Sequence, residues 1–313
     1  MIEFQFFIEV LVGGLLSGVM YSLVAIGFVL IYKASGVFNF AQGAMVFLAA
    51  LTFVSLLERG WNVWLALLVT LAAMVVLGML TERVVLRPLV NQPPITLFMA
   101  TIGLTFVLEG LSQLVWGSQP HGLDIGIKDE PIGWLLDNAG MSVSQFDLSA
   151  AGIAGVMVAV LALFFQYTRI GRALRAVADD HQAALAVGIP LKHIWAIVWT
   201  VAGFVALVAG LMWGSRNGVQ YALTFIALKA LPVLILGGFE SIPGAIIGGL
   251  IVGASEKLAE VYLPQLLNAP LTNLLGTAVN LQGIESWFAY VIALLFLLVR
   301  PQGLFGEKII DRV

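Results

Sequence analysis

The sequence contains no cysteine and only three histidines among its 313 residues. The absence of cysteine excludes disulfides and thiolate metal sites. The histidines, His121, His181 and His193, lack the spacing of metal ligands, so we expect no zinc site. Charged residues are also scarce: they make up 11% of the chain, whereas a soluble protein carries about 25%. This scarcity excludes an ordinary soluble domain and indicates an integral membrane protein.

Several sequence motifs of catalysis are missing as well. The chain has no G-x-x-x-x-G-K-[ST] phosphate loop, so we do not expect it to bind ATP in that way. It has no H-E-x-x-H motif and no recognisable Ser/His/Asp set for nucleophilic catalysis. We therefore predict that the chain is not an enzyme and that it holds no cofactor or metal of its own.

What the chain does contain is long apolar runs, with 60% hydrophobic residues and a mean hydropathy of +1.01. A helix needs about 20 apolar residues to cross a bilayer. The sequence therefore predicts an all-α, polytopic transmembrane bundle of about 8–10 spans, in a single domain over residues 1–313. The runs lie near 10–32, 36–57, 61–80, 95–116, 149–167, 194–213, 223–237, 243–263 and 286–299. Because the N-terminus is acidic, where a signal peptide would be basic, we expect the first run to be a retained span.

Two of the apolar runs are interrupted by polar residues or proline. Irregular backbone is tolerated at membrane depth where protein or water surrounds it, so each run predicts a broken or re-entrant helix. The interruptions are Asn39 and Gln42 in the run 36–57, and Lys229 and Pro232 in the stretch 222–238.

Basic residues gather on one side of the predicted bundle, and an excess of Lys and Arg marks the cytoplasmic face. That side holds Lys33, Arg83, Arg87, Arg169, Arg172, Arg175, Lys192, Arg300, Lys308 and Arg312, and the other holds Arg59, Lys128, Arg216 and Lys257. We therefore predict that the polar segment 169–193 and the C-terminus are cytoplasmic, and that 117–148 is an external loop.

Glycines recur four residues apart within the apolar runs. Such spacing lets helix backbones approach closely in a membrane, although a glycine-rich chain also produces it by chance. The pairs are Gly14/Gly18, Gly210/Gly214, Gly244/Gly248 and Gly249/Gly253. Together they favour a compact bundle.

The polar segment 169–193 is long and basic at its start, whereas a chain this hydrophobic is expected to have brief loops. Ala183 and Ala184 are small, strong helix formers, and Gly188 followed by Pro190 ends the helix. A short helix of small residues suits insertion into a groove on a partner protein. The alternative is a solvated loop between two spans.

Two amides, Asn39 and Gln42, stand in an apolar run, where they cost free energy unless they find hydrogen-bond partners. An amide offers a donor and an acceptor together, which suits the passage of a zwitterion or an amide. We interpret Asn39, Gln42 and the adjacent Gly43 as candidates for a substrate pathway, with Tyr21 and Tyr32 as weaker ones. A hydrogen-bonded clasp between helices explains the two amides equally well.

Glu109 and Lys229 are ionisable residues within apolar runs. Such residues are rare and usually face a bundle interior or water. A direct Glu109–Lys229 pair is one interpretation, and a lysine that snorkels towards the interface is another. A structural role for Glu109 is favoured over a role with substrate.

The segment Gln182-Ala183-Ala184-x-x-x-Gly188 resembles the E-A-A-x-x-x-G coupling loop of ABC importer permeases, with glutamine where many have glutamate. The chain is also similar, from about Gly13 to Phe305, to the shorter subunit of the branched-chain amino acid permease family. Three segments carry that likeness: GVFNFAQG at 36–43, LGGFESIPGA at 236–245 and RPQGLFG at 300–306. The stretch 263–284 is longer than the family pattern.

The resemblance implies a multi-pass permease in the plasma membrane, the inner membrane of a bacterium, that forms half of an import pore. It implies a second homologous permease, two ATP-binding cassette subunits that hold ATP and magnesium, and an external or periplasmic solute-binding protein. Membrane lipid is a further expected partner, and nucleic acid is not. The residues expected to couple to the ATPases are Arg172, Gln182, Ala183, Ala184, Gly188 and Ile189.

The resemblance predicts import of branched-chain amino acids or related small solutes, with urea, short amides or aromatic acids as alternatives within the same class. A different class is a self-sufficient secondary transporter that uses Glu109 and Lys229 as an ion site. That alternative predicts transport by the purified chain alone under an ion gradient.

Overall fold

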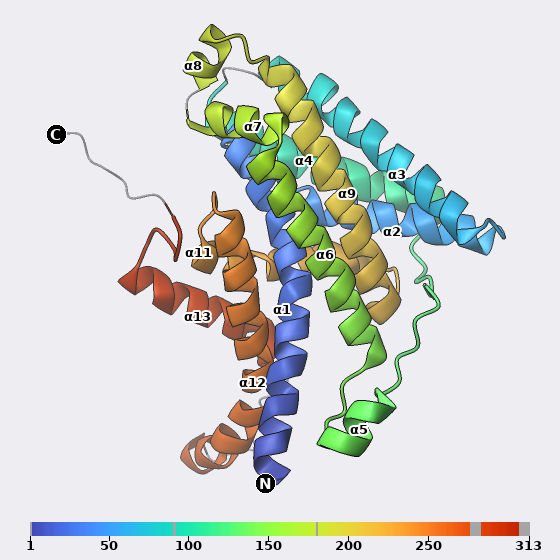
Figure 1. Cartoon of the computed structure of the whole chain (residues 1–313), viewed down its shortest axis with the longest axis vertical. Coiled ribbons are helices and arrows are strands. Elements are labelled where there is room, and N and C mark those ends of the chain that lie inside the picture. The colour runs from blue at the N-terminus through green and yellow to red at the C-terminus, as the bar shows by residue number, and fades with distance from the viewer. Residues whose placement is uncertain (1, 90–91, 180, 276–282, 307–313) are drawn as a thin grey trace. The chain divides into compact units, whose positions relative to one another are not determined.

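The chain is largely helical, and the computed structural model describes residues 2–89, 92–179, 181–275 and 283–306 (Figure 1). The α-helices are α1 (Ile2–Ser35), α2 (Gln42–Glu58), α3 (Val63–Leu80), α4 (Pro94–Trp116), α5 (Gly133–Ala139), α6 (Gln145–Tyr167), α7 (Arg169–Asp179), α8 (His181–Ala186), α9 (Leu191–Asn217), α10 (Ile226–Lys229), α11 (Leu231–Gly237), α12 (Ile242–Leu275) and α13 (Glu285–Val299). A π-helix, η1 (Thr81–Leu86), and two 3-10 helices, η2 (Arg87–Leu89) and η3 (Tyr221–Phe225), complete the set. Extended pairing within these residues is limited to two isolated bridges, His121–Val219 and Pro131–Ser144.

Within the described residues, six helical segments are long and apolar enough to cross a membrane by length and composition. They are Phe4–Ser35, Val63–Leu89, Ile95–Trp116, Gln145–Tyr167, Leu191–Asn217 and Ile242–Asn268. Three shorter apolar segments are Gln42–Glu58, Tyr221–Gly237 and Trp287–Val299. Together these segments coincide with the predicted apolar runs, and the prediction of an all-α polytopic membrane protein is confirmed. Three of the predicted spans are shorter than a full crossing, two of them because their runs are interrupted.

Both interrupted runs are broken helices, as predicted. Residues 36–41 are non-helical and separate α1 from α2. The second run divides into η3, α10 and α11, with Ala230 between the last two. Pro232 lies in the first turn of α11, where the missing N–H of proline leaves no helical bond unmade.

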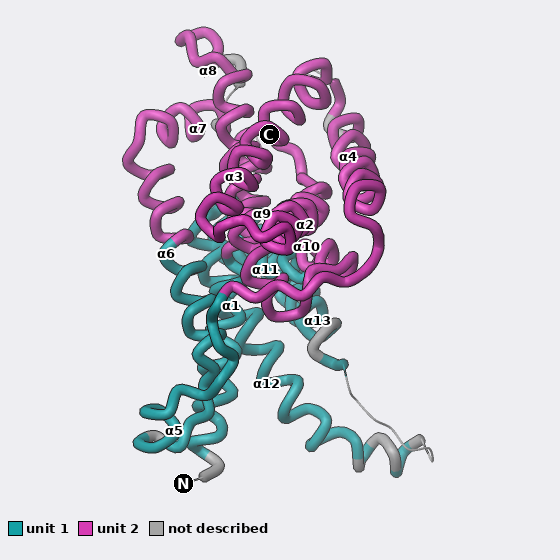
Figure 2. The backbone as a smooth tube through the Cα atoms, turned by 90° about the vertical axis from the view of Figure 1, so that its right-hand side faces the viewer, with its two compact units in different colours: residues 1–22, 126–156, 229–313 teal, residues 23–125, 157–228 magenta. Residues whose placement is uncertain are grey.

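The helices form two compact units, each with its own interior (Figure 2). Unit 1 comprises residues 1–22, 126–156 and 229–313, and unit 2 comprises residues 23–125 and 157–228. Helices α1 and α6 each contribute one part to either unit. The long loop 117–148 likewise divides between them, and α5 lies in its unit 1 part.

Unit 1 is built on a close crossing of α1 and α12. A Cβ added to Gly14 would lie 2.8 Å from Ala254 Cα, and one added to Gly18 would lie 2.6 Å from the Gly249 oxygen. The Ser22 hydroxyl lies 2.9 Å from the Gly18 oxygen and 3.2 Å from the Ile246 oxygen. The predicted close approach of helices at these glycine pairs is confirmed here, because nothing larger than hydrogen fits between the backbones.

Unit 2 is built around α9, which packs against α2 and α3. Trp199 and Ala202 of α9 are fully buried, and Gly210 lies directly against the Val46 carbonyl of α2. The apolar surface suited to lipid lies on other helices of this unit: Val160, Leu114 and Leu68 are exposed on α6, α4 and α3. A membrane protein can carry hydrophobic residues both in its interior and on its surface, because the surface faces lipid instead of water.

Candidate functional site

The break between α1 and α2 is organised by the two amides that the sequence singled out. Asn39 and Gln42 are both fully buried. The Asn39 oxygen accepts from the Ala41 N–H at 3.0 Å, and the Asn39 amide nitrogen donates to the Gln42 side-chain oxygen at 3.1 Å. Asparagine favours such a local bond because its short side chain can replace a backbone partner in a turn. These bonds define the turn that starts α2.

Three neighbouring elements hold this break in place. The Gln42 amide nitrogen donates to the Ala202 oxygen of α9 at 3.4 Å. The Thr101 hydroxyl of α4 lies 3.1 Å from the Phe38 oxygen and 3.4 Å from the Phe40 nitrogen. A Cβ on Gly43 would collide with the Thr224 oxygen of η3, so the start of α2 touches η3 without a side chain between them. The break is therefore a junction of α2, α4, α9 and η3.

This geometry is the one expected if the two amides form a hydrogen-bonded clasp between helices, which was the alternative to their lining a substrate pathway. The polar atoms of Asn39 and Gln42 bond to each other and to the backbone, and neither side chain reaches the surface of the described structure. Thr101, which the sequence analysis did not single out, belongs to the same cluster. A threonine in an apolar run carries no signal of its own, because its hydroxyl can bond within its own helix.

The two tyrosines proposed with the amides belong to different units. Tyr21 is buried in unit 1, and Tyr32 is half-buried in unit 2. The backbone carbonyl oxygen of Tyr32 accepts a hydrogen bond from the Gly36 N–H at 2.7 Å, and this bond closes the last turn of α1.

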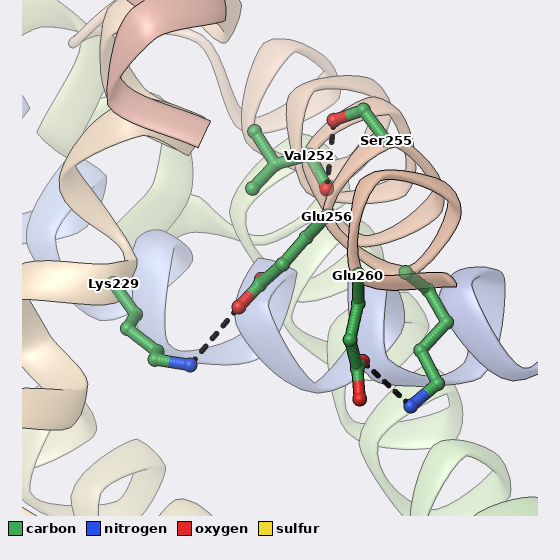
Figure 3. A network of polar contacts seen from close by, with 6 residues as sticks. Lys229, Val252, Ser255, Glu256 and Glu260 are labelled. Carbon is green, nitrogen blue, oxygen red and sulfur yellow. Dashed lines mark hydrogen bonds and ion pairs between the residues drawn. The ribbon is translucent and has the colours of Figure 1, made fainter. Parts of the chain in front are cut away.

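The two intramembrane charges each have a partner that the sequence analysis missed. In unit 2, the Tyr221 hydroxyl lies 3.2 Å from a carboxylate oxygen of Glu109, which is buried. In unit 1, the Lys229 Nζ donates to a carboxylate oxygen of Glu256 at 3.0 Å (Figure 3). Glu256 was itself detectable, as an acid within the apolar run 243–263, but distance along the chain hides its pairing with Lys229.

Lys229 also lies over an aromatic ring. Its Nζ is 5.9 Å from the centroid of the Tyr21 ring, within the range of a cation–π interaction. The Lys229 side chain is 37% exposed, whereas that of Glu256 is 10% exposed. The pair therefore has a covered acidic side and an open basic side.

The segment predicted to meet a partner begins with α7, which is fastened to the end of α6. The Arg175 guanidinium donates to the Phe165 oxygen at 2.6 Å and to the Gln166 oxygen at 3.2 Å. These carbonyls end α6 and lack helical partners, so a cation there satisfies them. Leu174 and Val177 are buried beneath α7. Arg172, a predicted coupling residue, is exposed, with its guanidinium 3.4 Å from the Tyr167 oxygen.

The Ala184–Gly188 spacing has a backbone explanation. The Gly188 N–H bonds to the Leu185 oxygen at 3.0 Å, and the Ile189 N–H bonds to the Ala184 oxygen at 2.9 Å. These two bonds make a Schellman ending of α8, which requires a left-handed residue, and Gly188 has a φ of +87°. A glycine at this position therefore sets the angle at which the chain leaves α8.

The surface of α8 presents apolar side chains. Leu185 is 52% exposed and Val187 is 77% exposed, whereas Ala184 is buried and faces inward. Ala183 is exposed and Ile189 is half-buried. The side chain of Gln182 lies outside the described residues. Apolar side chains that are exposed on α8 and on the turn that ends it suit a protein partner more than solvent.

In the part of the chain that the structure describes, no group of three or more His, Asp or Glu could hold a metal ion. Three candidate sites remain: the buried amide junction, the Lys229–Glu256 pair and the α7–α8 segment. They belong to a multi-pass membrane protein in which the described residues form six long apolar helices and several short, broken ones.

The model of one protein family, described as "Branched-chain amino acid transport system / permease component", matches residues 10–300. The chain belongs to this family. The resemblance seen in the sequence is thereby confirmed, and a transport permease is the class of protein to which the chain belongs.

Curated relatives extend over the full chain. The permease protein LivH of the high-affinity branched-chain amino acid transport system of Salmonella typhimurium is 27% identical, covering 99% of either chain. BraD of the corresponding system in Pseudomonas aeruginosa is also 27% identical over 99% of either chain. The ribose import permease protein RbsC of Escherichia coli is 23% identical over 89% of this chain and 80% of its own length. Among solved structures, PsaBC from Streptococcus pneumoniae in complex with Fab covers 92% of this chain and 89% of its own, with 11% identity and a TM-score of 0.41.

Proposed function

We propose that this chain is one permease subunit of an ATP-driven importer and carries branched-chain amino acids or related small solutes across the plasma membrane. The single observation that supports this function most strongly is the family match over residues 10–300, together with full-length relatives that are named as branched-chain amino acid permeases. The whole chain then acts as one permease domain. A second, homologous permease supplies the other half of the pathway.

The energy source in this proposal lies on other chains. Two ATP-binding cassette subunits hold ATP and magnesium, and this chain neither binds nor hydrolyses the nucleotide. We place the segment 169–193 and the C-terminus in the cytoplasm, because Lys and Arg are concentrated there. The ATPases then meet Leu185, Val187 and Arg172, which the α7–α8 segment turns outward.

Coupling in this proposal is mechanical. Closure of the ATPases around ATP presses on α8, and the Schellman turn at Gly188 passes the displacement to α9, which follows directly in the chain. Arg175 fastens the other end of the segment to α6. The permease pair then switches the side to which its pathway opens, an alternation between two packings. Uptake is directional when ATP and the loaded solute-binding protein favour different states.

The external partner is a solute-binding protein that meets the loop 117–148. Its delivery of solute explains why the permease itself needs only weak recognition, since a site must release what it receives. Asn39, Gln42 and Gly43 are proposed as part of the wall of the pathway, with Tyr21 and Tyr32 nearby in the sequence. Their present bonds describe a closed junction, which would have to open for a solute to reach the amides.

Reconstitution in vesicles tests this function. The chain, its companion permease, the two ATPases and the solute-binding protein are expected to take up leucine only when ATP is supplied to the ATPases. Omission of the ATPases is the matched control and should abolish uptake. Uptake by the purified chain alone, driven by a sodium or proton gradient, would contradict the proposal and support a secondary transporter.

A further inference from the structure

The Lys229–Glu256 pair lies where charges are energetically unfavourable. Glu256 is near the middle of the apolar segment Ile242–Asn268, and Lys229 ends α10 within the broken apolar run. Ionisable groups inside a membrane are rare and accompany solute or ion pathways. Figure 3 shows the two side chains reaching towards each other from α10 and α12, with the ammonium and carboxylate 3.0 Å apart.

The close crossing of α1 and α12 in unit 1 is made without this pair. The crossing of α1 and α12 is already held by backbone contact at Gly14 and Gly18 and by the hydroxyl of Ser22. A well-packed apolar pair of the same size is often as stable as a buried ion pair, since both charges must lose their water. The pair is therefore better explained by recognition than by stability.

The surroundings of the pair are asymmetric in a way that suits recognition. The carboxylate of Glu256 is covered, while the Lys229 side chain is 37% exposed. The ring of Tyr21 lies beside the ammonium, 5.9 Å from Nζ, and can hold it in place when its carboxylate partner is exchanged. A solute that approaches from the open side meets the lysine first.

We propose that Lys229 and Glu256 bind the head group of a zwitterionic α-amino acid, with Tyr21 as the residue that positions Lys229. The solute carboxylate pairs with the Lys229 ammonium, and the solute ammonium pairs with the Glu256 carboxylate. Each of the two protein charges exchanges its partner in the protein for a charge of the solute, so that no charge is left unpaired in the membrane. Binding by exchange is weak, which suits a site that must release its solute. This inference rests on the proposed function.

The charge arrangement predicts selectivity that a structural ion pair would not have. Leucine carries both charges, 4-methylpentanoate carries only the carboxylate and 3-methylbutylamine carries only the ammonium. Either analogue would leave one protein charge without a partner. The test is saturation-transfer NMR on the complex of both permeases and the ATPases, without the solute-binding protein, so that only the membrane site selects. Leucine is expected to bind at least about 10-fold more tightly than either analogue.

Two single variants should reverse that preference in opposite directions. Glu256→Gln keeps the lysine and is expected to prefer 4-methylpentanoate to leucine, whereas Lys229→Met keeps the acid and is expected to prefer 3-methylbutylamine. Tyr21→Leu should weaken leucine binding several-fold, while Tyr21→Phe retains a ring face of the same size and should bind leucine more tightly than Tyr21→Leu. The control, Lys257→Met with Glu260→Gln, removes the exposed intrahelical pair of α12 and should change nothing.

The outcomes separate this inference from the proposed function. If the importer takes up leucine with ATP but the two single variants keep the ordinary preference for leucine, the inference is wrong and the function stands. If those variants do not assemble, Tyr21→Leu decides: unchanged leucine binding overturns the site. An importer that takes up no amino acid overturns both.

Discussion

Two polar clusters lie at helix breaks, one in each unit, and they differ in how completely their partners are satisfied. The amides Asn39 and Gln42 of unit 2 are fully buried and bonded to each other and to the backbone. The Lys229–Glu256 pair of unit 1 is covered on its acidic side and open on its basic side. A closed cluster holds helices together, since each of its side-chain polar atoms already has a partner within the protein, whereas an open one can exchange its partner for a solute. The difference is therefore one of exposure and not of residue type.

The largest expected effect is at the closed junction, with Gly43→Val. A Cβ at this position collides with the Thr224 oxygen, and the rigid backbone of η3 cannot yield as a side chain would. Overpacking of this kind costs about 1–3 kcal/mol or more, and here it also forces α2 and η3 apart. We expect loss of folded protein in size-exclusion chromatography. Gly103→Ala, which places its Cβ in open space, is the control and should fold normally.

The next effect concerns function without loss of folding. Gly188→Val should abolish ATP-driven uptake, because a β-branched residue disfavours the left-handed turn that ends α8, by about 1–2 kcal/mol. Gly188→Asn tolerates that backbone and should keep most of the uptake. ATPase copurification and vesicle uptake measure the two together. Equal uptake by both variants would show that the turn does not position a coupling surface.

The third prediction concerns the stability that the two amides give to the closed junction. Asn39→Leu should lower the stability of unit 2 by about 1–3 kcal/mol, because it leaves the Ala41 N–H and the Gln42 oxygen without their partner. Gln42→Leu should cost less, since its bond to Ala202 is long at 3.4 Å. Thermal unfolding of the solubilised complex measures both. A loss of uptake larger than the loss of stability explains would support the proposed place of the amides in the wall of the pathway.

The smallest effect is expected at the contact between His121 and Glu58. His121 Nδ1 lies 2.8 Å from a Glu58 oxygen, and the glutamate side chain is 49% exposed. Exposed pairs contribute about 0–1 kcal/mol and are screened by salt. Glu58→Gln should therefore leave thermal stability and uptake nearly unchanged. A large loss of uptake would show that this contact, which joins residues on either side of α3 and α4, controls the loop 117–148.

Local patterns in the sequence predicted several elements correctly. The breaks at 36–41 and near Ala230 followed from polar residues and proline within apolar runs, since such residues cannot continue a helix without a partner. The end of α8 followed from Gly188, whose backbone preference is local. Close helix contact at the glycine pairs followed from residue size alone.

Partners distant in the sequence could not be predicted in this way. Tyr221 lies 112 positions from Glu109, and Glu256 lies 27 positions from Lys229. Each acid or base signals only that it needs a counterpart, and several residues in a bundle could serve. For the same reason the amides could be interpreted as a lining or as a clasp, because the pattern of residues does not show whether water reaches them.

Sequence alone was enough to predict that this protein is a helical membrane protein, where its helices break, and which short segment between the helices is polar. Composition and local preference suffice for these properties, because they depend on the solvent and on neighbouring residues along the chain. Only the tertiary structure decided that the amide cluster is closed and that the ion pair is open on one side. Those properties depend on which helices pack together, and packing joins atoms that the sequence keeps far apart.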